Sequence, residues 1–237
     1  MAFREAWPAL VEVDLGGWVA RHSGDAIRRT SSLNPLPGGG RLDAAMLKAG
    51  QWFYTQHGKP ALIRYPDFLV DHTALFRRLG YQPEGQTLTL LAPDIASPSH
   101  SLPSIAVRTL LDSDWLTARP RIIAGDQQVF QTMLDRIRCP ALFASVTIDA
   151  TVAAVAYGVV VDRLLIVESV ATDQAFQGRG LARAMVGAIM ARARALGAES
   201  AALQVVEGNE PALALYQRLG FSQLLYRYCY YRERNAR

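Results

Sequence analysis

Two glycines lie in a short segment whose backbone could bind an anion. Residues 177–182 read Gln-Gly-Arg-Gly-Leu-Ala, after an apolar, β-branched run at 164–171 and before an alanine-rich run at 181–196. The first run is typical of a buried strand, and the second of a helix that ends at Gly197. A helix that begins in a glycine turn leaves backbone N–H groups free, and its dipole favours a negative ligand. The segment therefore predicts a phosphate or pyrophosphate site.

The spacing excludes two common phosphate loops. A Walker loop needs a Gly-Lys-Ser/Thr ending that is absent here, and a dinucleotide loop needs a third glycine where Arg183 stands. The observed Gln-x-x-Gly-x-Ala resembles the acyl-CoA signature of the GNAT superfamily of N-acetyltransferases. Residues 209–221 follow with Asn-x-x-Ala-x-x-Leu-Tyr-x-x-x-Gly-Phe, which is similar to the second half of that family's motif. The resemblance covers residues 111–232.

The resemblance implies an α/β fold, with a mixed sheet (α+β) and flanking helices, as in GNAT-like acyltransferases. The expected strands are residues 105–110, 141–148, 151–160, 163–171, 199–206 and 222–232. The expected helices are residues 114–124, 126–138, 181–196 and 210–219.

The resemblance also implies acetyl-CoA as cosubstrate, and it assigns residues to its binding. Backbone groups near Val170, Ala171 and Thr172 pair with the pantetheine arm as an added strand would. The pyrophosphate falls to the turn and first helical residues, namely Gln177, Gly178, Arg179, Gly180, Leu181, Ala182 and Arg183. Asn209 either hydrogen-bonds the cofactor or caps the next helix.

Tyr216 and Glu168 are the candidate catalytic residues. Tyrosine titrates near ~10 and a thiol near ~8.5, so we expect Tyr216 to stabilise the leaving thiolate by a hydrogen bond rather than by full proton transfer. Its alternative role is packing. Glu168 is the expected general base, on one face with Val170 and Thr172 by strand alternation, where burial would raise its pKa. Glu207 acting through water, or no base at all, are the alternatives.

An internal repeat accounts for the first part of the chain. Residues 74–81 echo 214–221, and residues 39–46 echo 178–185 with nearly the same separation. Phe76 then stands in the place of Tyr216, and Arg41 in the place of Gly180. We therefore expect an internally duplicated fold in which the first copy has lost its own cofactor site.

Three segments follow from this repeat. Residues 1–92 are predicted to form a degenerate GNAT-like domain, residues 93–104 a Pro- and Ser-rich linker, and residues 105–237 the catalytic domain. Residues 28–36 are polar and turn-forming, and we expect a loop that faces the substrate cleft.

Composition narrows the class of protein. The chain has 237 residues, of which 50% are hydrophobic, and a net charge of +4 without a basic cluster that would suit nucleic acid. Cys139 and Cys229 are far apart, so we expect reduced thiols and a cytoplasmic location. No signal peptide, membrane span or metal-ligand spacing is expected, nor a nucleic-acid or membrane partner, and the protein is expected to be a monomer or homodimer.

The predicted reaction moves an acetyl group from acetyl-CoA to a primary amine of a small molecule or peptide. The amine attacks directly in a ternary complex, without a covalent enzyme intermediate. The alternative is an acyl-CoA-binding sensor or scaffold that has no activity.

Overall fold

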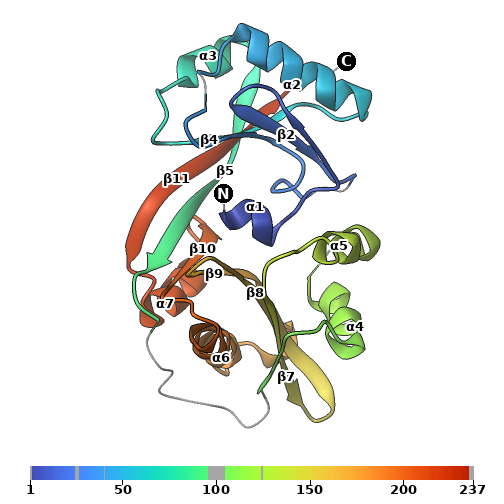
Figure 1. Cartoon of the computed structure of the whole chain (residues 1–237), viewed down its shortest axis with the longest axis vertical. Helices are drawn as coiled ribbons and strands as arrows, with labels where there is room; N and C mark the ends of the chain where they lie inside the picture. The colour runs from blue at the N-terminus through green and yellow to red at the C-terminus, as the bar shows by residue number, and fades with distance from the viewer. Residues whose placement is uncertain (1, 25–26, 40, 96–104, 124, 235–237) are drawn as a thin grey trace.

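The computed structural model describes residues 2–24, 27–39, 41–95, 105–123 and 125–234 (Figure 1). One mixed sheet runs through the molecule, in the strand order β1-β2-β3-β4-β11-β5-β10-β9-β8-β7-β6. The strands before the gap at 96–104 are β1 Val11–Asp14, β2 Trp18–His22, β3 Leu33–Pro35, β4 Leu62–Pro66 and β5 Tyr81–Ala92. Those after it are β6 Ile105–Arg108, β7 Ala141–Ile148, β8 Thr151–Val161, β9 Leu164–Thr172, β10 Ser200–Val206 and β11 Gln223–Glu233.

Helices cover both ends of this sheet (Figure 1). They are α1 Ala2–Ala6, α2 Ala44–Gln56, α3 Thr73–Arg78, α4 Ser113–Ile122, α5 Gln127–Leu134, α6 Leu181–Ala195 and α7 Glu210–Arg218, with a short 3₁₀ turn at Gln174–Phe176. Apolar side chains of α6 and α7 pack on one face of β7–β10, and α1, α4 and α5 pack on the other. Helices α2 and α3 pack on β2–β5 at the far end.

The expected elements of the second half are confirmed, with small differences at their ends. Strand β6 ends at Arg108 instead of residue 110, and α5 ends at Leu134 instead of residue 138. The hairpin between β7 and β8 turns at Asp149 and Ala150, which both have positive φ. In the first half, the expected loop at 28–36 is interrupted, because Leu33–Pro35 forms β3 beside β2 and β4.

The last strand of each half lies in the sheet of the other. Strand β11 pairs antiparallel with β4, and β5 pairs antiparallel with β10. The two exchanged strands also pair with each other along most of their length. The sheet is therefore continuous between strands β1–β5 and strands β6–β11, and the boundaries of the two expected domains stay a prediction. Most of the expected linker, 96–104, lies outside the described residues.

Helix α1 adds a second connection between the halves. It lies between them in Figure 1, and its residues pack on β8 and β9. The hydroxyl of the buried Tyr157 on β8 donates to the Ala6 carbonyl at 2.9 Å. The guanidinium of Arg21 on β2 donates to the carbonyl of Trp7. Residues 2–7 thus join the second half of the sheet to the first half.

In the part of the chain that the structure describes, none of the helices has the length and apolar character to span a membrane.

Candidate active site

Strands β9 and β10 separate at the middle of the sheet. They pair in parallel only from Ser200 opposite Leu164 to Leu203 opposite Val167. Beyond that point β10 continues to pair with β5 on its other side, as far as Val206. From Glu168 onward, the edge of β9 that faces β10 therefore has no strand paired to it in the described residues. Backbone groups on this edge can pair with an extended ligand.

A β-bulge lies where the strands separate. Ser169 has a φ of 50°, and Glu168 and Ala171 of β9 pair with Tyr157 and Val155 of β8, so two residues of β9 oppose one of β8. The extra residue breaks the alternation expected for Glu168, Val170 and Thr172. Val170 packs against the core under α6, as Val167 does, so Glu168 does not share the face of Val170. That part of the sequence prediction is wrong.

The glycine turn before α6 has the expected open backbone. Gly178 and Gly180 have φ of 76° and 73°, a region that glycine enters without strain. Gly180 is the N-cap of α6 and gives no side-chain cap, and Ala184 donates back to the Gly180 carbonyl. Within the described residues, the N–H groups from 178 to 183 have no backbone or side-chain acceptor. The turn is therefore able to bind an anion.

A cavity of about 590 Å³ extends from the separated strands toward α7. Its wall includes the predicted residues Glu168, Val170, Ala171, Asn209 and Tyr216. The other predicted residues do not line it, namely Thr172, Gln177, Gly178, Arg179, Gly180, Leu181, Ala182 and Arg183. Asn209 caps α7, since its side chain accepts from the N–H of Ala212 at 3.3 Å. This is the capping role that the sequence analysis gave as one of its two possible roles.

A second cavity of about 430 Å³ lies on the side of the first half, between β2–β4 and α1. Arg29, Glu168 and Gln204 line both cavities, so these three residues form the boundary where a group in one cavity can meet a group in the other. Glu207 lines neither of them and pairs with Arg227 at 3.6 Å near the surface.

Glu168 is 3% exposed and forms an ion pair with Arg29 through Oε2. Burial raises the pKa of Glu168 above its ordinary value, while Arg29 and, to a smaller extent, the nearby Trp7 lower it. Oε1 has no hydrogen bond of normal geometry. The side chain is thus a poorly solvated carboxylate with one free oxygen, as a general base requires.

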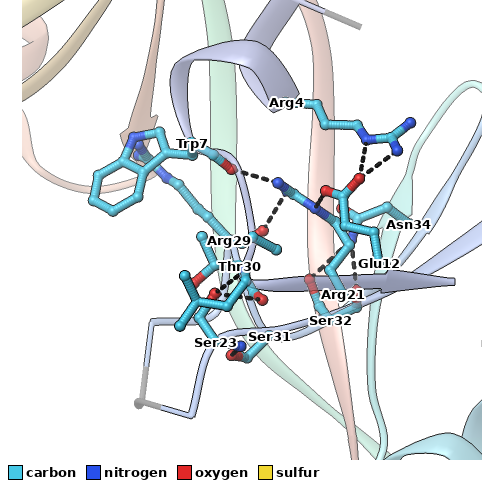
Figure 2. Close-up of polar contacts among 12 residues, drawn as sticks. Arg4, Trp7, Glu12, Arg21, Ser23, Arg29, Thr30, Ser31, Ser32 and Asn34 are labelled. Atoms are coloured by element: carbon cyan, nitrogen blue, oxygen red, sulfur yellow. Dashed lines mark hydrogen bonds and ion pairs between the residues drawn. The ribbon is translucent and has the colours of Figure 1, made fainter. Parts of the chain in front are cut away.

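Arg29 is held by a network that the sequence analysis did not predict (Figure 2). The Arg21 guanidinium donates to the Arg29 carbonyl at 2.7 Å and to Glu12 at 2.8 Å. The Arg29 guanidinium lies 5.7 Å from the centre of the Trp7 ring. The sequence analysis predicted that residues 28–36 form a loop facing the substrate cleft. Arg29 of this segment does line both cavities.

Tyr216 is 9% exposed and packs edge-on against Phe221, with ring centres 5.9 Å apart. Burial, with a smaller contribution from the negative charge of Glu168, raises the pKa of Tyr216 to about 12. The phenol therefore stays protonated at neutral pH and can donate a hydrogen bond into the larger cavity.

The sequence and the fold both match known acetyltransferases. Residues 1–230 match the family described as "Probable histone acetyltransferase Rv0428c C-terminal". The chain belongs to the GNAT family of N-acetyltransferases. A 49-residue stretch is 47% identical to the uncharacterized N-acetyltransferase YdgE of Bacillus subtilis (strain 168). That stretch spans 21% of this chain and 31% of YdgE.

Solved GNAT structures share the fold of this chain over most of its length. A GCN5-related N-acetyltransferase from Kribbella flavida superposes with a TM-score of 0.71 at 16% identity, over 96% of this chain and 91% of the other. A tandem GNAT protein from the clavulanic acid biosynthesis pathway gives 0.65 at 13% identity, over 85% and 74%. A GCN5-related N-acetyltransferase from Sphaerobacter thermophilus gives 0.64 at 18% identity, over 93% and 81%.

The geometry fits acetyl-CoA, the cosubstrate of this GNAT family. The free amides from Gly178 onward suit a pyrophosphate, and the free edge of β9 suits the amides of a pantetheine arm. Among the described residues, no group of three His, Cys, Asp or Glu side chains is placed to hold a metal ion.

Proposed function

We propose that this chain transfers an acetyl group from acetyl-CoA to a primary amine of a small molecule or peptide, by direct attack in a ternary complex. The observation that carries the proposal is the position of Glu168, on the shared wall of two cavities. The larger cavity adjoins the free edge of β9, and we assign it to the acetyl-pantetheine end. The smaller cavity is then left for the acceptor.

Glu168 acts on the acceptor, and Tyr216 acts on the thioester. Acetyl-CoA supplies the acetyl group activated as a thioester. Glu168 takes a proton from the acceptor ammonium, the amine nitrogen forms the new bond to the acetyl carbon, and the carbon–sulfur bond breaks. Tyr216 donates a hydrogen bond to the sulfur as it gains negative charge, and the thiolate takes up the second proton that the acetylated nitrogen releases, so that CoA leaves as the thiol.

Direct attack agrees with the positions of the cysteines. Cys139 and Cys229 line neither cavity. Burial raises the pKa of both thiols, which lowers the fraction of reactive thiolate.

Calorimetric titration with acetyl-CoA, followed by a thiol-release assay across amines and peptides, tests the proposal. We expect acetyl-CoA to bind and at least one amine to be acetylated. Binding without turnover on any acceptor would instead support the non-catalytic acyl-CoA sensor.

A further inference from the structure

Arg64 is a cavity arginine that forms no ion pair with a carboxylate among the described residues. It lies on β4, lines the 430 Å³ cavity, and makes no ion pair with a described residue. One Nη donates to the Tyr226 hydroxyl at 3.2 Å, and the guanidinium lies 3.9 Å from the centre of the Tyr228 ring. Its Nε is buried without a hydrogen-bond partner. A guanidinium offers five donors in a fork that matches a carboxylate, so this one has unused capacity.

The other arginines in this cavity differ from Arg64 in that each has an acid. Arg4 and Arg21 share Glu12, and Arg29 pairs with Glu168. Four arginines therefore stand against two carboxylates, Glu12 and Glu168, which leaves an excess of two positive charges around this cavity, one of them that of Arg64. Buried charges are normally paired, and an anionic group of a ligand would pair this one.

Residues that line the same cavity carry buried polar atoms of both kinds that have no hydrogen-bond partner. The donors are Nε of Arg64 and Nε2 of Gln204, and the acceptors are Oε1 of Glu168 and Oδ1 of Asn34. Buried polar atoms in native proteins are nearly always hydrogen-bonded, so a set of four in one cavity indicates a missing partner with both donors and acceptors. An ammonium group supplies donors only, and a carboxylate supplies acceptors only.

We infer that the acceptor is a zwitterion of the amino-acid type, whose amino group faces Glu168 and Asn34 while its carboxylate binds Arg64 and Gln204. This inference rests on the proposed function and adds the substrate class to it. A cavity of about 430 Å³ is within the range of small-molecule sites. A basic, lysine-rich peptide would instead bring positive charge to a wall that already has an excess of it.

The test compares each common L-amino acid with its own amide, which keeps the ammonium and lacks the carboxylate. Binding to the intact protein is measured by calorimetry in the presence of CoA, which cannot acetylate the ligand. We expect at least one amino acid to bind about tenfold or more tightly than its amide. Equal or tighter binding of the amides, or no binding by any amino acid, would overturn the inference.

Variants of Arg64 test whether this residue causes the preference for an amino acid over its amide. Arg64→Gln should reduce the difference between acid and amide to within about twofold while CoA binding is kept, and Arg64→Lys should keep part of it because the charge remains. Arg77→Gln, an exposed arginine on α3, is the matched control and should leave the preference intact. A preference that survives Arg64→Gln would contradict the assignment of Arg64. The wild-type comparison stands even if that variant does not fold.

Turnover with acetyl-CoA separates this inference from the proposed function. If amino acids bind with the expected preference but no amine is acetylated, the proposed function fails and the binding inference stands. If amides or basic lysine peptides are acetylated as efficiently as amino acids, the transferase proposal stands and the zwitterion inference fails.

Discussion

Glu168 illustrates how burial and one ion pair compete at a single carboxyl group. Burial has the larger effect and raises the pKa of Glu168, while Arg29 lowers it. The partner lies 139 positions away in the sequence, so no local pattern could pair the two residues. The sequence did predict a buried glutamate on this strand, because its neighbours are apolar.

Removing Arg29 should move the acidic limb of the pH–rate profile. A general base works only when it is deprotonated, so kcat/KM should fall as the pH drops through the raised pKa of Glu168. Arg29→Gln removes a positive charge that lowers this pKa, so the limb should shift to higher pH. Glu168→Gln should abolish the limb and lower kcat/KM about 10²-fold. An unshifted limb in Arg29→Gln would argue that another group titrates, and Arg77→Gln serves as control.

Tyr216 should act through its hydrogen bond alone. Its pKa of about 12 lies well above that of a thiol, so full proton transfer to a thiolate would cost about 5 kcal/mol. Tyr216→Phe should therefore lower turnover at least about tenfold and leave acetyl-CoA affinity nearly unchanged. Single-turnover kinetics with calorimetry would measure both quantities. Tyr231→Phe, which alters a ring stacked on Phe76 at the other end of the molecule, is the control, and unchanged turnover in Tyr216→Phe would remove the role assigned to Tyr216.

At the scale of elements, the first turns of α2 and α6 show why only one of the two matching helices suits an anion. The N-cap of α2 is Asp43, whose carboxylate accepts from the N–H of Met46 at 2.9 Å. A negative group therefore already lies at the start of that helix. At α6 the cap is Gly180, and the amides are free. This contrast supports the predicted loss of a cofactor site in the first half.

A charge placed at Gly180 should weaken CoA binding. Asn and Asp both tolerate the left-handed backbone of this position, and only Asp adds a negative charge near the pyrophosphate. We expect Gly180→Asp to bind CoA about tenfold more weakly than Gly180→Asn, with similar thermal stability. Calorimetry at two salt concentrations would also show the difference shrinking as salt screens the charge. Equal affinities would exclude the turn as the pyrophosphate site.

Local pattern predicted the elements of the second half because each carries its own signal. Helix α6 begins after a glycine and ends before Gly197, and the β7–β8 hairpin turns where the apolar runs stop. The bulge at Ser169 was not predictable, since nothing in the alternation of residues 164–172 marks an inserted residue. Alternation placed Val170 and Glu168 on the same face of the strand, and the bulge places them on opposite faces. Arg64 and Gln204 were also missed as site residues, because their place depends on which strands pair.

At the scale of the molecule, the pairing pattern of the two halves is similar. In one half β3 runs parallel to β4, which then pairs antiparallel with β11, and in the other β9 runs parallel to β10, which then pairs antiparallel with β5. We propose that this reflects the internal duplication suggested by the sequence, with the final strands exchanged. The repeat predicted two similar units, but pairing between strands so far apart in the chain leaves no trace in local composition.

The two halves should fold only together. A fragment of residues 105–237 lacks β5 between β10 and β11, and a fragment of residues 1–95 lacks β11 beside β4. We expect neither fragment alone to show a cooperative thermal transition, and we expect the two to copurify and bind acetyl-CoA when produced together. Circular dichroism and affinity purification would measure this. A fragment 105–237 that folds and binds acetyl-CoA alone would contradict the expectation.

The position of β11 also affects how this protein can fold during synthesis. Gln223–Glu233 is the last strand of the described chain, yet it fills the place between β4 and β5, both made much earlier. A nascent chain on the ribosome therefore keeps the edges of two strands open until this segment has emerged. Chains released early, by a premature stop codon or a break in the message, would expose those edges and become targets for chaperones and proteases.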